Sequence, residues 1–383
     1  MKLLTALFYM TLLSSMSGNS RITDAPPLLA LHLAQYTQTS DTTLPVWPKN
    51  HVFNHSASFQ SSMITTAALT SSKRPLKAIL GFTQKNRPVE VYYFPGSSNE
   101  KALVLGGVHG SELSAMEVVK QLVEDLSAGT PIYYSVIVIP CLFPDNAAAA
   151  AQYSHEINST KNIGRYTQAG LPDPNRQMPP LGKAFNPDSP LDFAQRTIER
   201  ENQLLLQLIQ EFKPDRIVNV HAIRNIAKAG IFADPRTDCE GLALGYETDS
   251  LLAINMATYI HQKGGNVSGN GLAANTPNTL YSSDPPIAPK GALQKRNLYG
   301  SQLPNNLGMG VSLGSWAATA VCDANRQYQR PAMRVITVEF PGNKRPADYT
   351  AAERKEHEKQ LSLYAGAISQ VFLTQTFTQP DYN

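Results

Sequence analysis

The stretch ALVLGGVHGSE, residues 102–112, gives the strongest indication of the fold class. Residues 102–108 form a continuous apolar run, which is typical of a strand buried on both faces of a parallel sheet. Residues 114–126 follow with apolar side chains at helical spacing, and residues 132–139 form another buried strand. A strand, a helix and a second strand in this order predict an α/β fold with a largely parallel sheet.

The rest of the chain continues this alternation. Helices are expected at residues 192–212, 251–262 and 351–372, and strands at residues 77–82, 89–94, 216–220 and 333–340. Residues 267–314 are rich in Gly, Pro and Asn, which predicts a long set of loops. We therefore expect a three-layer α/β sandwich in which helices cover both faces of a twisted, largely parallel sheet.

Composition excludes several classes of protein. Hydrophobic residues make up 42% of the 383 residues, which is too many for a disordered chain. The net charge of +3 is too small for a general nucleic-acid binder, so no nucleic-acid partner is expected. Three cysteines, Cys141, Cys239 and Cys322, match no zinc-ligand spacing and leave at least one thiol unpaired. Cys239 and Cys322 could pair, and Cys141 is expected to be a buried thiol.

The N-terminus has the composition of a secretory signal peptide. Met1 and Lys2 precede an apolar run at residues 3–13 and a stretch of small polar residues at 14–20. The run is too short to span a bilayer, which needs about 20 residues. We therefore expect a signal peptide at residues 1–20, a secreted or periplasmic protein, and no stable membrane anchor. Residues 21–74 are expected to form an extension and residues 75–375 the main domain.

Three predicted strands end on residues that can do chemistry. His109 and Glu112 follow the strand at residues 102–108, His221 follows the strand at 216–220, and Glu339 lies in the strand at 333–340. Ligands of open α/β sheets bind at the carboxyl ends of the strands. Two imidazoles and a carboxylate that leave one position open are the ligand set of a catalytic zinc. Glu339 would then act as a general base on a water at the metal.

Each of these residues also has a structural alternative. His109 and Glu112 could cap the following helix, because a carboxylate is favourable in a first turn. His221 could be a hydrogen-bonded core histidine. Glu339 is harder to explain in this way, since an unpaired carboxylate is costly to bury inside a strand. The set as a whole favours a functional site.

A second group of polar residues lies between the strands and contains Arg165, Asn175 and Arg176. Arginine suits carboxylate recognition because its planar fork donates two hydrogen bonds. One arginine could polarise a carbonyl group while the Asn–Arg pair holds a carboxylate. Taken by themselves, these residues could equally be ordinary loop residues.

Together these motifs resemble those of zinc carboxypeptidases of the carboxypeptidase A superfamily, and within it the murein tripeptide amidase branch. The resemblance covers about residues 75–372. Its segments, in chain order, are LVLGGVHGSE at 103–112, PCLFPDN at 140–146, DPNR at 173–176, PDRIVNVH at 214–221, SLGSWA at 312–317 and ITVEFP at 336–341.

The resemblance implies an eight-stranded mixed sheet and one zinc ion per chain. The zinc ligands would be His109, Glu112 and His221. Glu339 would be the base and Arg165 the residue that stabilises the oxyanion. The expected substrate-binding residues are Asn175, Arg176, Ser315 and Trp316, and the implied partner is a peptide or muropeptide substrate.

Two departures from the family pattern affect the expected substrate. Residues 177–179, Gln-Met-Pro, stand where Asn-Phe-Pro is usual. Residues 222–224, Ala-Ile-Arg, resemble those of succinylglutamate desuccinylase and aspartoacylase. The leading hypothesis is an exported zinc metallopeptidase or amidase that acts on peptidoglycan stem peptides. The alternatives are a zinc-dependent N-acyl amino-acid deacylase and a non-catalytic peptide-binding protein on the same scaffold.

Overall fold

The structure is a computed structural model that describes residues 65–152, 163–167, 172–242, 244, 246–272, 310–342 and 349–374. The expected signal peptide and nearly all of the expected extension lie outside these residues. Within the extension, the described residues form one short helix, α1 (Thr66–Thr70). No helix in the described part of the chain is both long and apolar enough to cross a bilayer.

A mixed sheet of seven strands organises the described residues, in the order β1-β2-β4-β3-β5-β9-β6. The four strands β4, β3, β5 and β9 are mutually parallel, and β1, β2 and β6 pair antiparallel at the edges. The strands are β1 (Leu76–Phe82), β2 (Pro88–Phe94), β3 (Lys101–Gly106), β4 (Ser135–Ile139), β5 (Arg216–Ile223), β6 (Gly230–Asp234) and β9 (Arg334–Pro341). An eighth strand of this sheet, which the resemblance implies, is not among the described residues.

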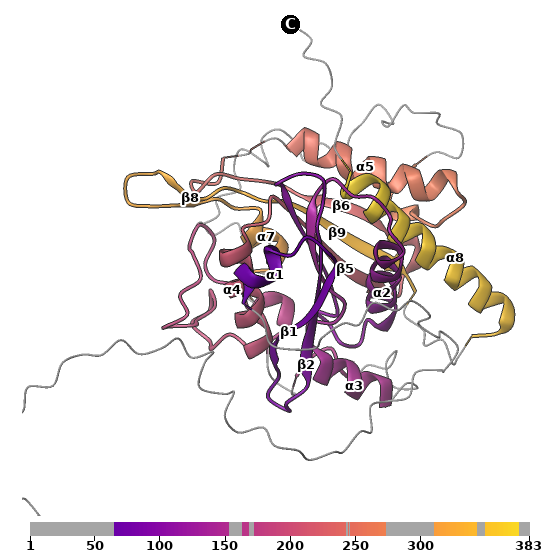
Figure 1. The fold of residues 1–383 in the computed structure, drawn as a ribbon, viewed down its shortest axis with the longest axis horizontal. Coiled ribbons are helices and arrows are strands. Elements are labelled where there is room, and N and C mark those ends of the chain that lie inside the picture. Colours follow the sequence, from indigo (N-terminus) through magenta and orange to yellow (C-terminus); the bar gives the residue numbers. More distant parts are fainter. Residues whose placement is uncertain are drawn as a thin grey trace, which may run out of the picture. The chain divides into compact units, whose positions relative to one another are not determined.

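Helices pack against both faces of the sheet (Figure 1). One face shares a core with α2 (Leu113–Ser127), α5 (Tyr246–Gln262) and α8 (Ala351–Ala367). The other face shares a core with α1, α4 (Arg200–Phe212) and α7 (Leu313–Ala317). Because side chains alternate along a strand, β3 places Val104 in the first core and Leu103 and Leu105 in the second.

The remaining elements are short. Helix α3 (Pro144–Gln152) follows β4, and β7 (Val321–Cys322) pairs with β8 (Tyr328–Arg330) in a separate two-stranded ribbon. A disulfide joins Cys239 to Cys322 across 83 residues, so the pairing that the sequence left open is present. Cys141 is a free thiol that is half-buried, not fully buried as expected, and burial raises its pKa to about 12.

Two sequence predictions differ from the structure in a physically instructive way. The helix expected at residues 192–212 begins only at Arg200. Upstream, the buried carboxylate of Asp192 accepts hydrogen bonds from the backbone N–H groups of Ala194 and Arg196, which holds a compact turn instead of a helix. The closing helix ends at Ala367, and residues Ile368–Phe372 continue it as a π-helical turn.

Candidate metal centre

A tight turn after β3 brings the first two candidate ligands together. Gly107 has a φ of 67°, a backbone conformation that favours glycine. A Cβ atom on Gly110 would lie only 2.3 Å from the backbone of Asn146, so the turn can pass there only without a side chain. The Glu112 N–H then donates to the His109 carbonyl oxygen at 3.0 Å, and both side chains face the carboxyl ends of the strands.

Three side chains converge at this edge of the sheet. His109, Glu112 and His221 are buried, and each offers one ligand atom within 4.8 Å of the others. The Nδ1 atom of His109 lies 2.8 Å from one Glu112 oxygen, and Nδ1 of His221 lies 2.8 Å from the other. The described residues therefore form a compact group of two imidazoles and one carboxylate that can hold a metal ion, as the sequence predicts.

The charges of this group depend on one another. Burial by itself would lower the pKa of His109, but Glu112 and Asp173 more than offset it and raise that pKa to about 9. Burial would raise the pKa of the Glu112 carboxyl, yet the two imidazoles hold it well below its usual value. Glu112 is thus ionised, which is the form that binds a cation.

Asp173 is a member of the site that the predicted ligand set omits. Its Oδ1 atom lies 2.7 Å from Nε2 of His109, on the side of the ring away from Glu112. A carboxylate in this position fixes the ring orientation and leaves Nδ1 available to a metal, as carboxylates that accept a hydrogen bond from a metal-binding imidazole commonly do. The available signal was its place as the first residue of the DPNR segment, two residues before Asn175.

Glu339 lies on the strand next to His221. The two residues are register partners in the parallel pairing of β5 with β9. Both occupy odd-numbered positions with Ile217 and Val335, so both face the side of the sheet covered by α1, α4 and α7. Glu339 is half-buried, and burial raises the pKa of its carboxyl despite the opposing effect of His221.

The predicted polar residues lie close to this group. Arg165 donates to Glu112 at 3.2 Å and to Asp173 at 2.8 Å while 28% of its side chain stays exposed. The Asn175 amide lies 3.5 Å from Nε2 of His221 and accepts a hydrogen bond from the Leu313 N–H, which ties the start of α7 to the site. Arg176 is half-buried and donates to the Asn175 carbonyl oxygen.

The two expected binding residues on α7 have different surroundings. Ser315 is half-buried, and its hydroxyl oxygen lies 3.0 Å from that of Ser312. Trp316 is completely buried, donates from its indole N–H to the Lys183 carbonyl oxygen at 2.9 Å, and has the Arg330 guanidinium over its ring. Trp316 therefore packs between α7 and Arg330, and its expected role in substrate binding stays a prediction.

The unusual residue after the Asn–Arg pair has a structural explanation. Gln177 is completely buried and donates to Glu199 at 3.0 Å. Its amide oxygen accepts hydrogen bonds from the Glu199 N–H and the Asn202 side chain. Gln177 therefore anchors the DPNR turn to the start of α4, and the departure from the family pattern concerns the support of the turn.

Comparisons with known proteins give structural likenesses only. No family model matches the chain, and no curated protein sequence matches it. A "putative metallopeptidase" from Shewanella amazonensis is 14% identical with a TM-score of 0.42, over 81% of this chain and 89% of that one. Murein-tripeptide amidase MpaA from Escherichia coli O157 is 17% identical with a TM-score of 0.39, over 79% of this chain and 93% of that one.

A metallo-carboxypeptidase from Burkholderia cenocepacia is 15% identical with a TM-score of 0.40, over 79% of this chain and 67% of that one. These proteins are of the class that the sequence motifs resemble. Identities and TM-scores this low assign neither a family nor an activity to this chain, so its function has to be argued from its own residues.

Proposed function

We propose that this protein is an exported zinc-dependent metallopeptidase or amidase that hydrolyses an amide bond near a free carboxylate, with peptidoglycan stem peptides as its substrates. The observation that carries the proposal is the convergence of His109, Glu112 and His221 beside Glu339. A metal-ligand set and a neighbouring carboxylate base are the two parts that metal-assisted hydrolysis requires.

The donor set fits zinc. Two imidazole nitrogens and one carboxylate leave a fourth tetrahedral position for water or substrate, which is the pattern of catalytic zinc sites. The carboxylate of Asp173 behind His109 supports the same assignment, because it orients the ring toward the ion. When bound, the ion would supply Lewis acidity at the scissile carbonyl group.

The protein's own residues would move the proton and stabilise charge. Glu339 would accept a proton from the attacking water and return it to the leaving amine, for which a carboxyl pKa raised by burial is suited. Arg165 keeps three of its five donors free of Glu112 and Asp173 and would stabilise the developing charge on the carbonyl oxygen.

The substrate class follows from the cations around the site. Arg176 offers a planar guanidinium suited to bidentate binding of a carboxylate, and the adjacent Asn175 offers an amide. A substrate with a free carboxylate near the cleaved amide matches this pair. The choice of peptidoglycan stem peptides rests on the resemblance of the sequence motifs to the murein tripeptide amidase branch. A deacylase is the second candidate, favoured by Ala222, Ile223 and Arg224 directly after His221.

The test combines metal analysis with three substrates. Protein purified without chelator should contain about one zinc per chain, and His109→Ala should lose it, while His261→Ala on α5 keeps it. The native enzyme is then incubated with a muropeptide, ordinary peptides and N-acyl amino acids, and the products are identified by mass spectrometry. Cleavage of only the N-acyl amino acids would favour the deacylase. A His109→Ala variant with unchanged metal content would remove the proposed site.

A further inference from the structure

A cavity lies at the amino ends of the parallel strands, which is the opposite end of the sheet from the candidate metal centre. It is bounded by the first residues of β5 and β9, Arg216 and Arg334, and has a volume of about 680 Å³. Small-molecule pockets commonly span roughly 300–1,000 Å³. Since Arg216 and His221 are five residues apart on one strand, about 17 Å separates the two edges, so this cavity does not belong to the metal centre.

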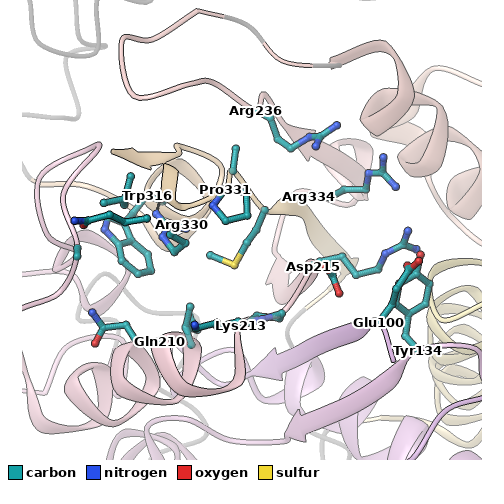
Figure 2. A pocket seen from close by; sticks show the side chains of 18 of the residues that line it. Glu100, Tyr134, Gln210, Lys213, Asp215, Arg236, Trp316, Arg330, Pro331 and Arg334 are labelled. Atoms are coloured by element: carbon teal, nitrogen blue, oxygen red, sulfur yellow. Dashed lines mark hydrogen bonds between the residues drawn. The ribbon is translucent and has the colours of Figure 1, made fainter. Parts of the chain in front are cut away.

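The walls of this cavity, which we call the amino-edge pocket, combine apolar and cationic side chains. Figure 2 shows Arg330 beside Trp316 on one side, Arg236 and Arg334 on another, and Lys213 at the end of α4. Apolar contacts come from Ile209, Met333, Pro331 and Val321.

Cations outnumber carboxylates in the lining. The cations are Lys213, Arg216, Arg236, Arg330 and Arg334, and the carboxylates are Glu100 and Asp215. One further carboxylate, the buried Asp249, lies behind the wall and pairs with both Arg236 and Arg334. Even with Asp249 included, five cations face three carboxylates, which leaves an excess of two positive charges.

Arg330 is the clearest source of this excess. Its guanidinium donates to the carbonyl oxygens of Trp316, Ala317 and Thr319 at 2.8–3.0 Å, at the end of α7. Carbonyl groups satisfy hydrogen bonds but do not neutralise a charge, and the described residues place no carboxylate against Arg330. Among the described residues, its buried Nε atom has no hydrogen-bond partner. Burial lowers the pKa of Arg330 to about 10, so the group stays charged at neutral pH.

Part of this positive charge is accessible. Arg236 and Arg334 expose 23% and 21% of their side chains although Asp249 is completely buried, and Lys213 is exposed. A half-enclosed cationic cavity attracts anions because its low-dielectric walls concentrate the electrostatic field. Arginine forks bind carboxylates and phosphates through paired hydrogen bonds.

We propose that the amino-edge pocket binds a small organic anion, a phosphate or carboxylate group attached to an apolar body. The anionic group would lie between Lys213, Arg330 and Arg334, and the apolar body would lie against Ile209 and Met333. The proposed amide hydrolysis does not use this site, although Trp316 and residues 214–216, which line it, belong to segments that carry the family resemblance.

Calorimetric titration of the metal-loaded protein tests the proposal with phenyl phosphate and benzoate as probes and benzyl alcohol as a neutral control. We expect both anions to bind and the alcohol not to. Inorganic phosphate is added as a competitor to separate the two anion types. If it displaces phenyl phosphate but not benzoate, the pocket is a phosphate site. If both probes bind equally, the pocket is a general oxyanion site. Absence of binding by either anion overturns the proposal.

Three variants locate the binding. Lys213 has a φ of 55°, which asparagine tolerates, so Lys213→Asn removes the charge without new backbone strain. It should weaken binding roughly threefold to tenfold, and Arg330→Gln should weaken it about tenfold or more. Lys355→Gln, at an exposed position of α8, should have no effect.

Arg330→Gln could fail to fold. If Lys213→Asn is the only one of these two variants that is soluble, its affinity for the anions decides whether they bind in the amino-edge pocket. His109→Ala serves as the reverse control, because a probe bound at the metal centre would be lost in that variant. Native affinity in folded Lys213→Asn, or loss of binding only in His109→Ala, overturns the assignment to the amino-edge pocket.

Discussion

Strands β5 and β9 carry different chemistry at their two ends. At the carboxyl edge, His221 and Glu339 lie side by side within a group of imidazoles and carboxylates whose charges are matched to one another. At the amino edge, the register partners are Arg216 and Arg334, two like charges on neighbouring strands. Burial, together with the nearby Arg334, lowers the pKa of Arg216 to about 10, and Arg334 pairs with the buried Asp249.

The two ends of the strands therefore bury charged groups for different reasons. Acidic and imidazole groups at the carboxyl edge are arranged so that one cation can complete them. The cations of the amino edge contact carbonyl groups, aromatic rings and the buried carboxylate of Asp249. The guanidinium of Arg216, for example, lies 3.9 Å from the centroid of the Tyr134 ring. Substitutions at the first edge should therefore change chemistry, and those at the second should change stability or anion binding.

The largest effect is expected from Glu339→Gln. The amide keeps the shape of the side chain but cannot accept a proton, so turnover of the amide substrate should fall roughly 10²- to 10⁴-fold. Metal content and the unfolding temperature should stay near native values, and Glu358→Gln on the exposed face of α8 should change neither. Near-native turnover in Glu339→Gln would show that another group is the base. An unfolded variant would favour a structural role for the carboxylate.

At the amino edge, Asp249→Asn should destabilise the protein. The completely buried Asp249 accepts from Arg236 and Arg334 at 2.5 Å each, and its loss leaves two guanidinium groups without their shared carboxylate. Breaking a buried pair costs about 3–5 kcal/mol, and the partial exposure of both arginines reduces this to about 2–3 kcal/mol.

Denaturant unfolding measures this loss, with Glu240→Gln as the control. Glu240 pairs with Arg326 on the surface, where the two side chains are 46% and 80% exposed, so its loss should cost well under 1 kcal/mol. Turnover per folded molecule of Asp249→Asn should equal that of the native protein. A large fall in turnover would mean that the two edges are coupled.

The sequence was informative where one physical signal dominated. Strand β3 and the parallel strands beside it bury both faces, so their apolar runs identified them directly. Strand β6 was not predicted, because its sequence contains one Gly, one Ala, one Asp and the exposed Phe232 and so has no apolar run. Its position depends mainly on its pairing with β9. The late start of α4, at Arg200 instead of residue 192, depends on the side chain of Asp192, which no periodicity reveals.

The same distinction applies to the site. His109, Glu112 and His221 could be predicted because each follows a strand, and strand ends meet at one edge of a parallel sheet. The contact between Asp173 and His109 spans 64 residues and passes through an irregular turn, so spacing alone could not have found it. The amino-edge pocket joins α4, the ribbon β7-β8 and the starts of β5 and β9, and its lining residues have no common spacing in the sequence.

Arg176→Lys tests whether the carboxyl edge recognises a substrate carboxylate. Lysine preserves the charge but loses the planar fork, so binding of a carboxylate should weaken by about 1.5–3 kcal/mol, or one to two orders of magnitude in kcat/KM. An amidated substrate should already be poor and little affected by the substitution. Comparing kcat/KM for the acid and amide forms separates recognition from folding. Equal losses on both would mean that Arg176 does not contact the carboxylate.

The smallest effect on the enzyme is expected from Lys213→Asn. Lys213 ends α4 in the left-handed region, where its N–H donates to the Ile209 carbonyl oxygen. Asparagine tolerates this conformation better than lysine, which should stabilise the folded state, whereas loss of a cation at a helix C-terminus should destabilise it by about 0.3–1 kcal/mol. These contributions oppose each other, so the free energy of unfolding should change by less than about 0.5 kcal/mol.

Metal content and kcat/KM of Lys213→Asn should be native, because the substitution lies about 17 Å or more from His221 along the strand direction. Denaturant unfolding and turnover measured on one preparation check both points. If kcat/KM falls while stability is unchanged, the amino edge influences the metal centre, and the independence of the two ends of β5 and β9 is wrong.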